Sequence, residues 1–299
     1  MEKIDVIVNT DPGIDDAVAI KILLQSGRFN VLLFATSGAN VPAELGARNC
    51  NFLVHRYGNG ETVAIGAQTP LSKELVTAED IHGEGGLGSF KVPKKFDCKN
   101  KNAIELMYEK IMQNTKKVSI ISLGAFTNIA ILFKKHPDVI SKIEKIYAMI
   151  GSMNGEGNIT KFAEFNSYCD PDAFFEVLKS NIPIVFNPKE IGEKAMIYNE
   201  EVMCRCGEGF DNTMFEILRD AREMRNDCEC FYVYDAHTIL SIIKPELYEI
   251  FNVDVSLSLM KESDGQCFIT KNDAGLHQCL RMKNKHKVRQ CLLELTLEQ

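Results

Sequence analysis

Short apolar runs alternate with segments of helical periodicity through the first half of the chain. Runs rich in β-branched residues predict strands at 4–8, 31–35, 63–65, 118–122 and 145–150. Between them, apolar residues at helical spacing predict helices at 16–25, 42–57, 103–113 and 128–133. Strands separated by helices indicate an α/β fold with an open, mostly parallel, Rossmann-like sheet and helices on both faces.

The organisation favours one domain. The 299 residues contain no Pro/Gly/Ser-rich linker, internal repeat or low-complexity segment, so a single domain over 1–299 is expected. The second half is less regular, and its segment 213–226 predicts a charged helix at the surface.

Charge and composition exclude several classes of partner. The net charge is −7, with acidic and basic residues mixed along the chain, whereas nucleic-acid binding needs clustered basic residues. Apolar runs stay well short of the ~20 residues that span a bilayer, so no membrane partner is expected. The N-terminus lacks the pattern of a signal peptide, so we expect the protein in the cytoplasm.

Ten cysteines in a chain of this length do not indicate a disulfide scaffold. Two local pairs, Cys204/Cys206 and Cys228/Cys230, have in principle enough thiolates for zinc. Their spacing is tighter than in most structural zinc sites, which favours chance clustering.

The topology predicts where a ligand binds. In open α/β sheets, ligands lie beyond the carboxyl ends of the strands. The segments 9–16, 37–40, 123–128 and 151–166 occupy that position and are rich in Gly, Asn, Asp or Thr. We expect them to converge on one edge of the sheet.

A turn with three carboxylates follows the first predicted strand. Asp11, Asp15 and Asp16 repel one another, and a helix N-terminus offsets only ~0.3–1 kcal/mol of that repulsion for each acid. A divalent cation offsets far more, and ligands that are all oxygen indicate calcium or magnesium. Helix capping is the alternative: Asp11 could cap a helix with Pro12 in its first turn, but Asp15 and Asp16 would remain unexplained.

The turn 11–17 closely resembles the N-terminal signature of the inosine-uridine nucleoside hydrolase family. The resemblance continues, in order and spacing, to about residue 245. It includes a Gly-Asn-like pair at 38–40, a His-Gly-Glu loop at 81–88 and a Leu-Thr-Asn-Ile-Ala-like segment at 123–130. An Ala-Glu-Phe-Asn segment follows within 157–166, with 170–171 behind it, and 234–235 stands at the position of the family's His-Asp.

The resemblance implies a calcium site. Its ligands would be Asp11, both oxygens of Asp16, Asp235 and the backbone carbonyl of Leu123, with ribose hydroxyls and a water completing the shell. The implied reaction is hydrolysis of the N-glycosidic bond of a ribonucleoside through an oxocarbenium-like transition state, as in nucleoside salvage. Asp11 would act as the general base on the water that the metal holds.

The resemblance also implies the ribose contacts. Asp15, Asn40 and Asn166 would bind the ring hydroxyls, and Asn158 and Glu164 the 5′-hydroxyl. Taken singly, Asn40 could instead be a turn residue, and Glu164 and Asn166 could be capping groups before a helix near Pro171.

Three departures from the family pattern affect what can be transferred. Asn9 replaces an acid, and we expect it behind the metal ligands. The segment 186–188 departs from the family's Gly-Leu-Asp strand end. Tyr234 replaces the histidine that assists the leaving base, and its ordinary pKa of ~10 makes it a poorer proton donor.

The leaving group therefore has two candidate partners, His82 and Tyr234, while His237 is expected to face the scaffold from a helix. Because the chain has no tryptophan to stack a purine, uridine or broad acceptance is favoured.

Two other functions compete with the hydrolase. A riboside-binding family member without turnover is one. A magnesium phosphatase of the haloacid-dehalogenase type is the other, although Asn9 stands where its nucleophile would be. A homodimer or homotetramer is expected.

Overall fold

A nine-stranded sheet runs through the part of the chain that the computed structural model describes, residues 2–224 and 230–298, with side chains described for 2–219 and 230–298. Its order is β10-β9-β11-β6-β5-β4-β1-β2-β3. The strands are β1 Ile4–Thr10, β2 Phe29–Thr36, β3 Val63–Ile65, β4 Val118–Ser122, β5 Ile143–Met149, β6 Ile184–Asn187, β9 Tyr248–Leu257, β10 Cys267–Lys271 and β11 His277–Met282. A separate small sheet pairs β7 (Ile197–Tyr198) with β8 (Cys230–Phe231).

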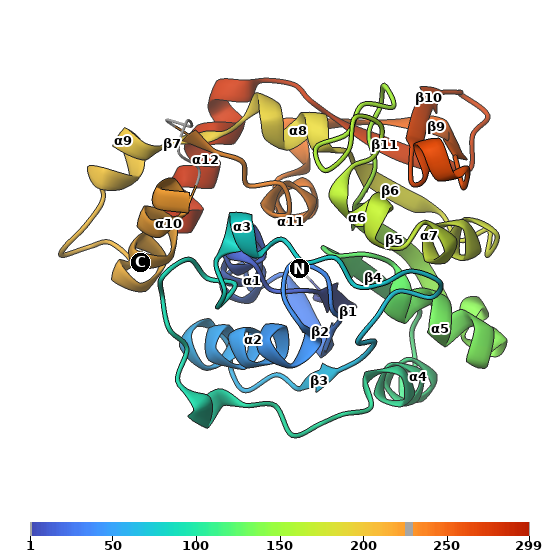
Figure 1. Ribbon diagram of the computed structural model, residues 1–299, viewed down its shortest axis with the longest axis horizontal. Coiled ribbons are helices and arrows are strands. Elements are labelled where there is room, and N and C mark those ends of the chain that lie inside the picture. The colour runs from blue at the N-terminus through green and yellow to red at the C-terminus, as the bar shows by residue number, and fades with distance from the viewer. Residues whose placement is uncertain (1, 225–229, 299) are drawn as a thin grey trace.

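Helices cover both faces of the large sheet (Figure 1). One face packs against α1 Ile14–Gln25, α2 Ala43–Tyr57, α10 Asn212–Met224, α11 Ala236–Ile243 and α12 Lys285–Leu297. The other packs against α4 Ala103–Gln113, α5 Thr127–Lys135 and α7 Pro171–Leu178. Short helices connect them: α3 Glu79–His82, α6 Phe165–Cys169, α8 Lys189–Lys194, α9 Asn199–Met203, and the 3-10 turns Lys94–Phe96, Pro137–Lys142, Pro245–Leu247 and Lys261–Ser263.

The predicted fold class is confirmed, and each strand and helix predicted in the first half is present. β1 to β6 and β11 pair in parallel, as the alternating pattern predicts. The antiparallel extension, in which β9 lies between β10 and β11, has no counterpart in the sequence prediction.

The segment 213–226 was predicted as a charged helix at the surface, and α10 forms there with Glu216 and Arg219 exposed. Residues 225 and 226 lie outside the described part of the chain. The other face of α10 was not predicted: Met214, Ile217 and Leu218 are buried in the core with residues of α1. Its apolar residues recur at the spacing of an amphipathic helix, with Glu216 and Arg219 on the opposite face.

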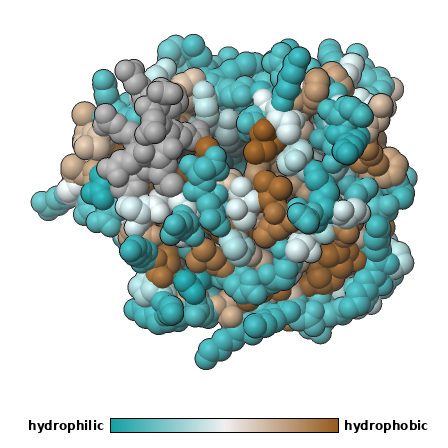
Figure 2. Space-filling model, viewed as in Figure 1, coloured by the Kyte–Doolittle hydropathy of each residue, from teal (hydrophilic) through white to brown (hydrophobic). Residues whose placement is uncertain are grey.

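The surface is mostly polar, with hydrophobic residues gathered near the middle and lower right of the face in Figure 2. Within the described residues, every helix is too short or too polar to cross a membrane. Cys204 and Cys206 are exposed, and Cys230 is half-buried in β8. Cys228, the remaining member of the two predicted pairs, lies outside the described residues.

A buried lysine joins the C-terminal segment to the core. Lys21, in the middle of α1, has no exposed surface. Its Nζ lies 3.1 Å from Asp211 Oδ2 and donates to the carbonyls of Thr296 (2.7 Å) and Glu298 (3.0 Å). Asp211 in turn accepts from Thr213 N and Met214 N at the start of α10. The chain end consequently lies beside α10 (Figure 1).

Replacing Lys21 by alanine should destabilise the protein strongly. The change leaves two backbone carbonyls without their donor and leaves the Asp211 carboxylate, among the described side chains, only the more distant Arg56 as a cationic partner, 3.7 Å away. Breaking a buried pair costs about 3–5 kcal/mol. Urea unfolding followed by circular dichroism measures the loss. Lys116→Ala is the matched control, because the Lys116–Glu2 pair is exposed and its removal should leave the midpoint unchanged. Equal midpoints for both variants would contradict the role of Lys21.

Candidate active site

A cavity of about 410 Å³ opens at the carboxyl ends of the central strands. The four segments expected to converge there do so, since each contributes to the lining. The lining residues are Asp15, Asn40, Ala78, Asp80, Ile81, His82, Leu123, Met149, Asn158, Ile159, Glu164, Phe165, Asn166, Tyr232, Tyr234 and Asp235. Following the roles that the family resemblance implies, we call the lining residues Asp15, Asn40, Leu123, Asn166 and Asp235 the sugar half, and the lining residues Ile81, Ile159, Phe165, Tyr232 and Tyr234 the base half.

The aspartate turn connects β1 to α1 and is held by short polar contacts. Asp16 Oδ1 accepts from Thr10 Oγ1 at 2.5 Å. Its Oδ2 accepts from Gly13 N at 3.0 Å and from Asn40 Nδ2 at 3.1 Å. The acid that caps the helix is thus Asp16, not Asp11, and the capping alternative leaves Asp11 unexplained.

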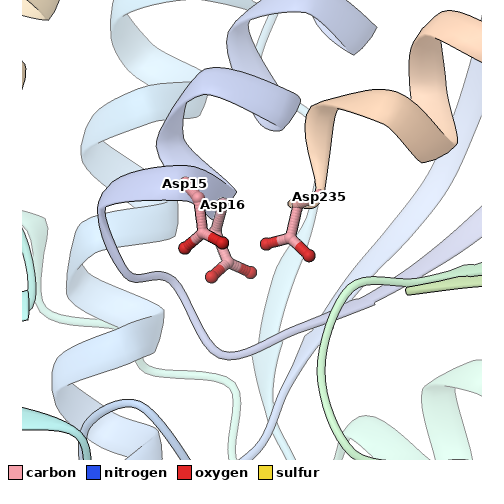
Figure 3. A group of neighbouring side chains, drawn as sticks. All are labelled: Asp15, Asp16 and Asp235. Atoms are coloured by element: carbon pink, nitrogen blue, oxygen red, sulfur yellow. The ribbon is translucent and has the colours of Figure 1, made fainter. Parts of the chain in front are cut away.

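Three carboxylates, two from the start of α1 and one from a distant part of the chain, meet at this edge. One oxygen each of Asp15, Asp16 and Asp235 lie within 4.8 Å of one another. Figure 3 shows the first two on the opening turn of α1 and Asp235 facing them from the segment that leads into α11. The group includes Asp15, which the family resemblance assigned to ribose, and such a set of oxygen donors fits a hard divalent cation.

Asp11 lies beside this group with no exposed surface. Its Oδ2 accepts from Asn40 N at 2.9 Å, whereas its Oδ1 is buried without a hydrogen-bond partner. A Cβ on Gly124 would collide with that oxygen, so the β4 loop approaches Asp11 as closely as glycine allows. A buried carboxylate oxygen without a donor is costly, and a cation would satisfy it.

The electrostatics agree with a cation site. Burial, followed by the neighbouring Asp16 carboxylate, holds the pKa of Asp11 well above its usual range. Burial and then Asp15 raise the pKa of Asp16, and burial with Asp15 and Asp16 raises the pKa of Asp235. Several buried carboxylates cannot all ionise at neutral pH unless positive charge joins them.

Leu123 and Asn166 are tied to each other. Asn166 Nδ2 donates to the Leu123 carbonyl at 2.8 Å and to the Met149 carbonyl at 3.0 Å. The Leu123 carbonyl retains a second lone pair, so the contact leaves room for another partner. The structure therefore brings the expected ligand carbonyl and the expected ribose amide to one point beside the carboxylates.

Glu164 and Asn158 shape the loop that closes the cavity. Glu164 is the N-cap of α6 and accepts from Gly151 N, Asn166 N and Ser167 N at 2.8, 2.8 and 3.1 Å. Burial raises its pKa to about 7, although these donors partly offset the effect. Asn158 Oδ1 accepts from Phe165 N. Glu164 is thus a capping residue, but of α6 and not of the helix at Pro171, whose N-cap is Asp170. Glu164 also lines the cavity as expected.

His82 sits between the two halves in a defined tautomer. Its Nδ1 accepts from Ile14 N at 3.1 Å, so this nitrogen carries no proton and Nε2 is the donor of the neutral ring. His237, by contrast, has no exposed surface in α11 and its Nδ1 lies 2.8 Å from Tyr248 Oη. The expectation that His237 faces the scaffold is confirmed, and burial lowers its pKa to about 3.

Several lining residues were missed by sequence reasoning. Ala78, Asp80 and Ile81 immediately precede His82, and Ile159 and Phe165 belong to the segment that also carries Asn158 and Glu164. Their neighbours were recognised through the polar side chains of the family motifs, whereas these residues lie in loops or in helices of four or five residues, which are too short for a periodic pattern. Tyr232 lies two residues from Tyr234, and the rings are tilted at 32° with centroids 5.5 Å apart.

Asn9 organises the strand ends beneath the site. Its Nδ2 donates to Ser122 Oγ at 2.8 Å and to the Ala125 carbonyl at 2.9 Å. Its Oδ1 accepts from Asn128 Nδ2 at 2.9 Å, and its backbone carbonyl accepts from Leu123 N. Asn9 thereby fixes the loop that presents the Leu123 carbonyl.

The chain is similar to proteins of known activity. The model of the inosine-uridine preferring nucleoside hydrolase family matches residues 6–295. The pyrimidine-specific ribonucleoside hydrolase RihA of Escherichia coli O139:H28 is 35% identical over 251 residues, which cover 81% of this chain and 80% of that protein.

Solved structures share the fold. A plant nucleoside hydrolase, PpNRh1, superposes with a TM-score of 0.89 at 22% identity over 99% of both chains. A purine-preferring ribonucleoside hydrolase from Gardnerella vaginalis gives 0.83 at 20% identity over 98% of both chains.

Asn9→Asp should lower the free energy of unfolding by about 1–3 kcal/mol, because it removes the donor to Ser122 and Ala125 and sets a carboxylate oxygen against a carbonyl. Urea unfolding of both proteins measures the change. Asn59→Asp, the same substitution at an exposed position, is the control and should stay within about 0.5 kcal/mol. A variant as stable as the parent would show that an acid is tolerated beneath the site.

Proposed function

The chain belongs to the inosine-uridine preferring nucleoside hydrolase family and cleaves ribonucleosides, and we propose that it uses calcium and prefers pyrimidine ribonucleosides. The reaction is hydrolysis of the N-glycosidic bond, which yields ribose and the free base. The observation that carries the proposal is the buried carboxylate group of Asp15, Asp16 and Asp235 beside the unpartnered oxygen of Asp11.

Asp11, Asp16, Asp235 and the Leu123 carbonyl are the proposed calcium ligands. All are oxygen donors at one end of the cavity, and calcium accepts six to eight such oxygens in flexible geometry, whereas magnesium demands a strict octahedron. When bound, the ion supplies the positive charge that offsets these carboxylates and polarises a water. Asp15, within the same group, then remains for the ribose, together with Asn40 and Asn166.

Asp11 is the proposed general base. As the water oxygen attacks C1′, its proton passes to the Asp11 carboxylate, which is buried beside the other acids. The C1′–N bond breaks and its electron pair leaves with the base, which takes up a proton. His82 and Tyr234 are the proposed partners of the leaving base, and His82 can offer only its Nε2 proton, since Nδ1 accepts from Ile14 N.

The proposed 5′-hydroxyl partners are Asn158 and Glu164. Both hold the loop over the cavity through backbone contacts and both line it. A substrate hydroxyl bound there would use binding energy at a distance from the bond that breaks, which supports distortion of the sugar toward the transition state.

The proposed base preference rests on the relative and on the cavity wall. RihA, named as pyrimidine-specific, is the similar curated protein. The chain has no tryptophan, and the base half offers tyrosine, phenylalanine and isoleucine side chains. We also propose that the enzyme acts in the cytoplasm, since the nine cysteines that the structure describes are all free thiols.

A panel of uridine, cytidine, inosine and adenosine tests the reaction, with ribose release as the measurement. We expect the pyrimidine nucleosides to give the larger kcat/KM. Asp11→Asn should lower kcat by about 10²–10⁴, the usual contribution of a general base. The matched control is Asp138→Asn, an exposed acid far from the cavity. If the wild type with calcium releases ribose from none of the four, the chain is a riboside-binding protein instead.

Calcium should stabilise the protein as well as activate it. Relief of carboxylate repulsion in the folded state raises the free energy of unfolding by about 2.7 kcal/mol at a ligand concentration of 100 Kd. Thermal unfolding with a chelator and then with calcium or magnesium measures the shift. Asp235→Asn should abolish most of it. A larger shift with magnesium than with calcium would contradict the choice of ion.

A further inference from the structure

We propose that Gly192 and Asn187 are positioning residues that hold Tyr234 as a fixed aromatic wall of the base half. The inference rests on the proposed function, because it concerns how the base is received. It accounts for two departures from the family pattern together, Tyr234 itself and the strand end at 186–188.

Gly192, in α8, leaves the space that the Tyr234 ring occupies. A Cβ at this position would lie 2.5 Å from Tyr234 Cδ1, 3.1 Å from Cε1 and 3.2 Å from the Tyr234 Cα. These separations are shorter than van der Waals contact, so the ring rests directly on the helix at the one residue without a side chain. Any larger residue at 192 must push the ring away from α8.

Asn187 holds the tyrosine backbone. It is the last residue of β6 and is 1% exposed. Its Nδ2 donates to the Tyr234 carbonyl at 2.8 Å and to Thr238 Oγ1 at 3.0 Å. An amide is required, because a carboxylate here would set an oxygen against the Tyr234 carbonyl oxygen. The asparagine therefore matches the tyrosine segment that it supports.

The hydrogen bond from Asn187 to Tyr234 also links the two halves of the site. Asn187 pairs with Met149 across β5 and β6, and the Met149 carbonyl accepts from Asn166 in the sugar half. Tyr234 precedes Asp235 in the chain. Tyr234 is thus fixed from α8, from β6 and by the neighbouring Tyr232 ring. A ring held in this way acts as a stationary surface for the base.

Substitution of Gly192 distinguishes binding of the base from binding of the sugar. Gly192→Ala should raise the KM for uridine roughly ten-fold, the effect of losing one well-made contact, while inhibition by free ribose stays unchanged. A merely structural defect would weaken uridine and ribose alike. Lys194→Ala, an exposed change on the same helix, is the control and should alter neither.

A double-mutant cycle tests whether the effect passes through the ring. In the Tyr234→Ala background there is room for a Cβ at 192, so Gly192→Ala should add nothing to the KM. An equal, additive effect in both backgrounds overturns the proposal. So does an equal loss of uridine and ribose binding in the single variant.

Asn187→Asp provides an independent variant should Gly192→Ala fold poorly. We expect the KM for uridine to rise and the calcium concentration for half-maximal activity to rise with it, since Asp235 follows Tyr234. Asn187→Ser, which retains a donor, should recover part of both. If Asn187→Asp behaves as the wild type, Asn187 does not position Tyr234.

The double-mutant cycle can also be measured without catalysis. If the wild type cleaves no nucleoside, the proposed function fails, and thermal unfolding of the wild type, the two single variants and the double variant still tests the contact between Gly192 and Tyr234. Gly192→Ala should lower the Tm with Tyr234 present and leave it unchanged in the Tyr234→Ala background. Equal Tm losses in both backgrounds would refute the contact.

Discussion

Buried negative charge at one sheet edge is the constraint on which the structure depends. Asp11 and Asp16 belong to the first turn after β1, and Asp235 arrives from the far end of the chain. Folding forces them together although burial and mutual repulsion oppose ionisation. The sheet, the helices on both faces and the Lys21 contacts supply the stability that makes such a charged centre tolerable, and the proposed cation would offset its repulsion when bound.

Neutral amide side chains surround this group of buried acids. Asn9 and Asn166 donate to oxygens at the end of β4 and in the loop after it, Asn40 donates to Asp16, and Asn187 donates to the Tyr234 carbonyl. A further carboxylate at any of these positions would add charge to a region that already holds three buried acids. Amide side chains position the loops through hydrogen bonds without adding charge to that of the proposed metal ligands.

The sequence allowed the fold of the first half to be predicted because buried parallel strands read as apolar runs and their helices keep a regular period. The antiparallel β9–β11 unit was missed, since its strands are half-exposed and mix polar with apolar residues. In the site, Asp11, Asp15 and Asp16 were found because acids so close in sequence demand an explanation. Gly192 could not be found, because its importance lies in the absence of a side chain beside a ring that is distant in sequence.

Tyr234 shows how departures from a family pattern compensate one another. Taken alone, a tyrosine in place of a histidine is a loss of proton-donating ability at neutral pH. In the structure the same ring fills the space over Gly192, is held by an amide at Asn187 and lies against Tyr232. Proton donation can pass to His82, whose tautomer Ile14 N fixes. In the proposed mechanism, two residues thus share the tasks that one histidine could combine: Tyr234 supplies a surface for the base, and His82 supplies the proton.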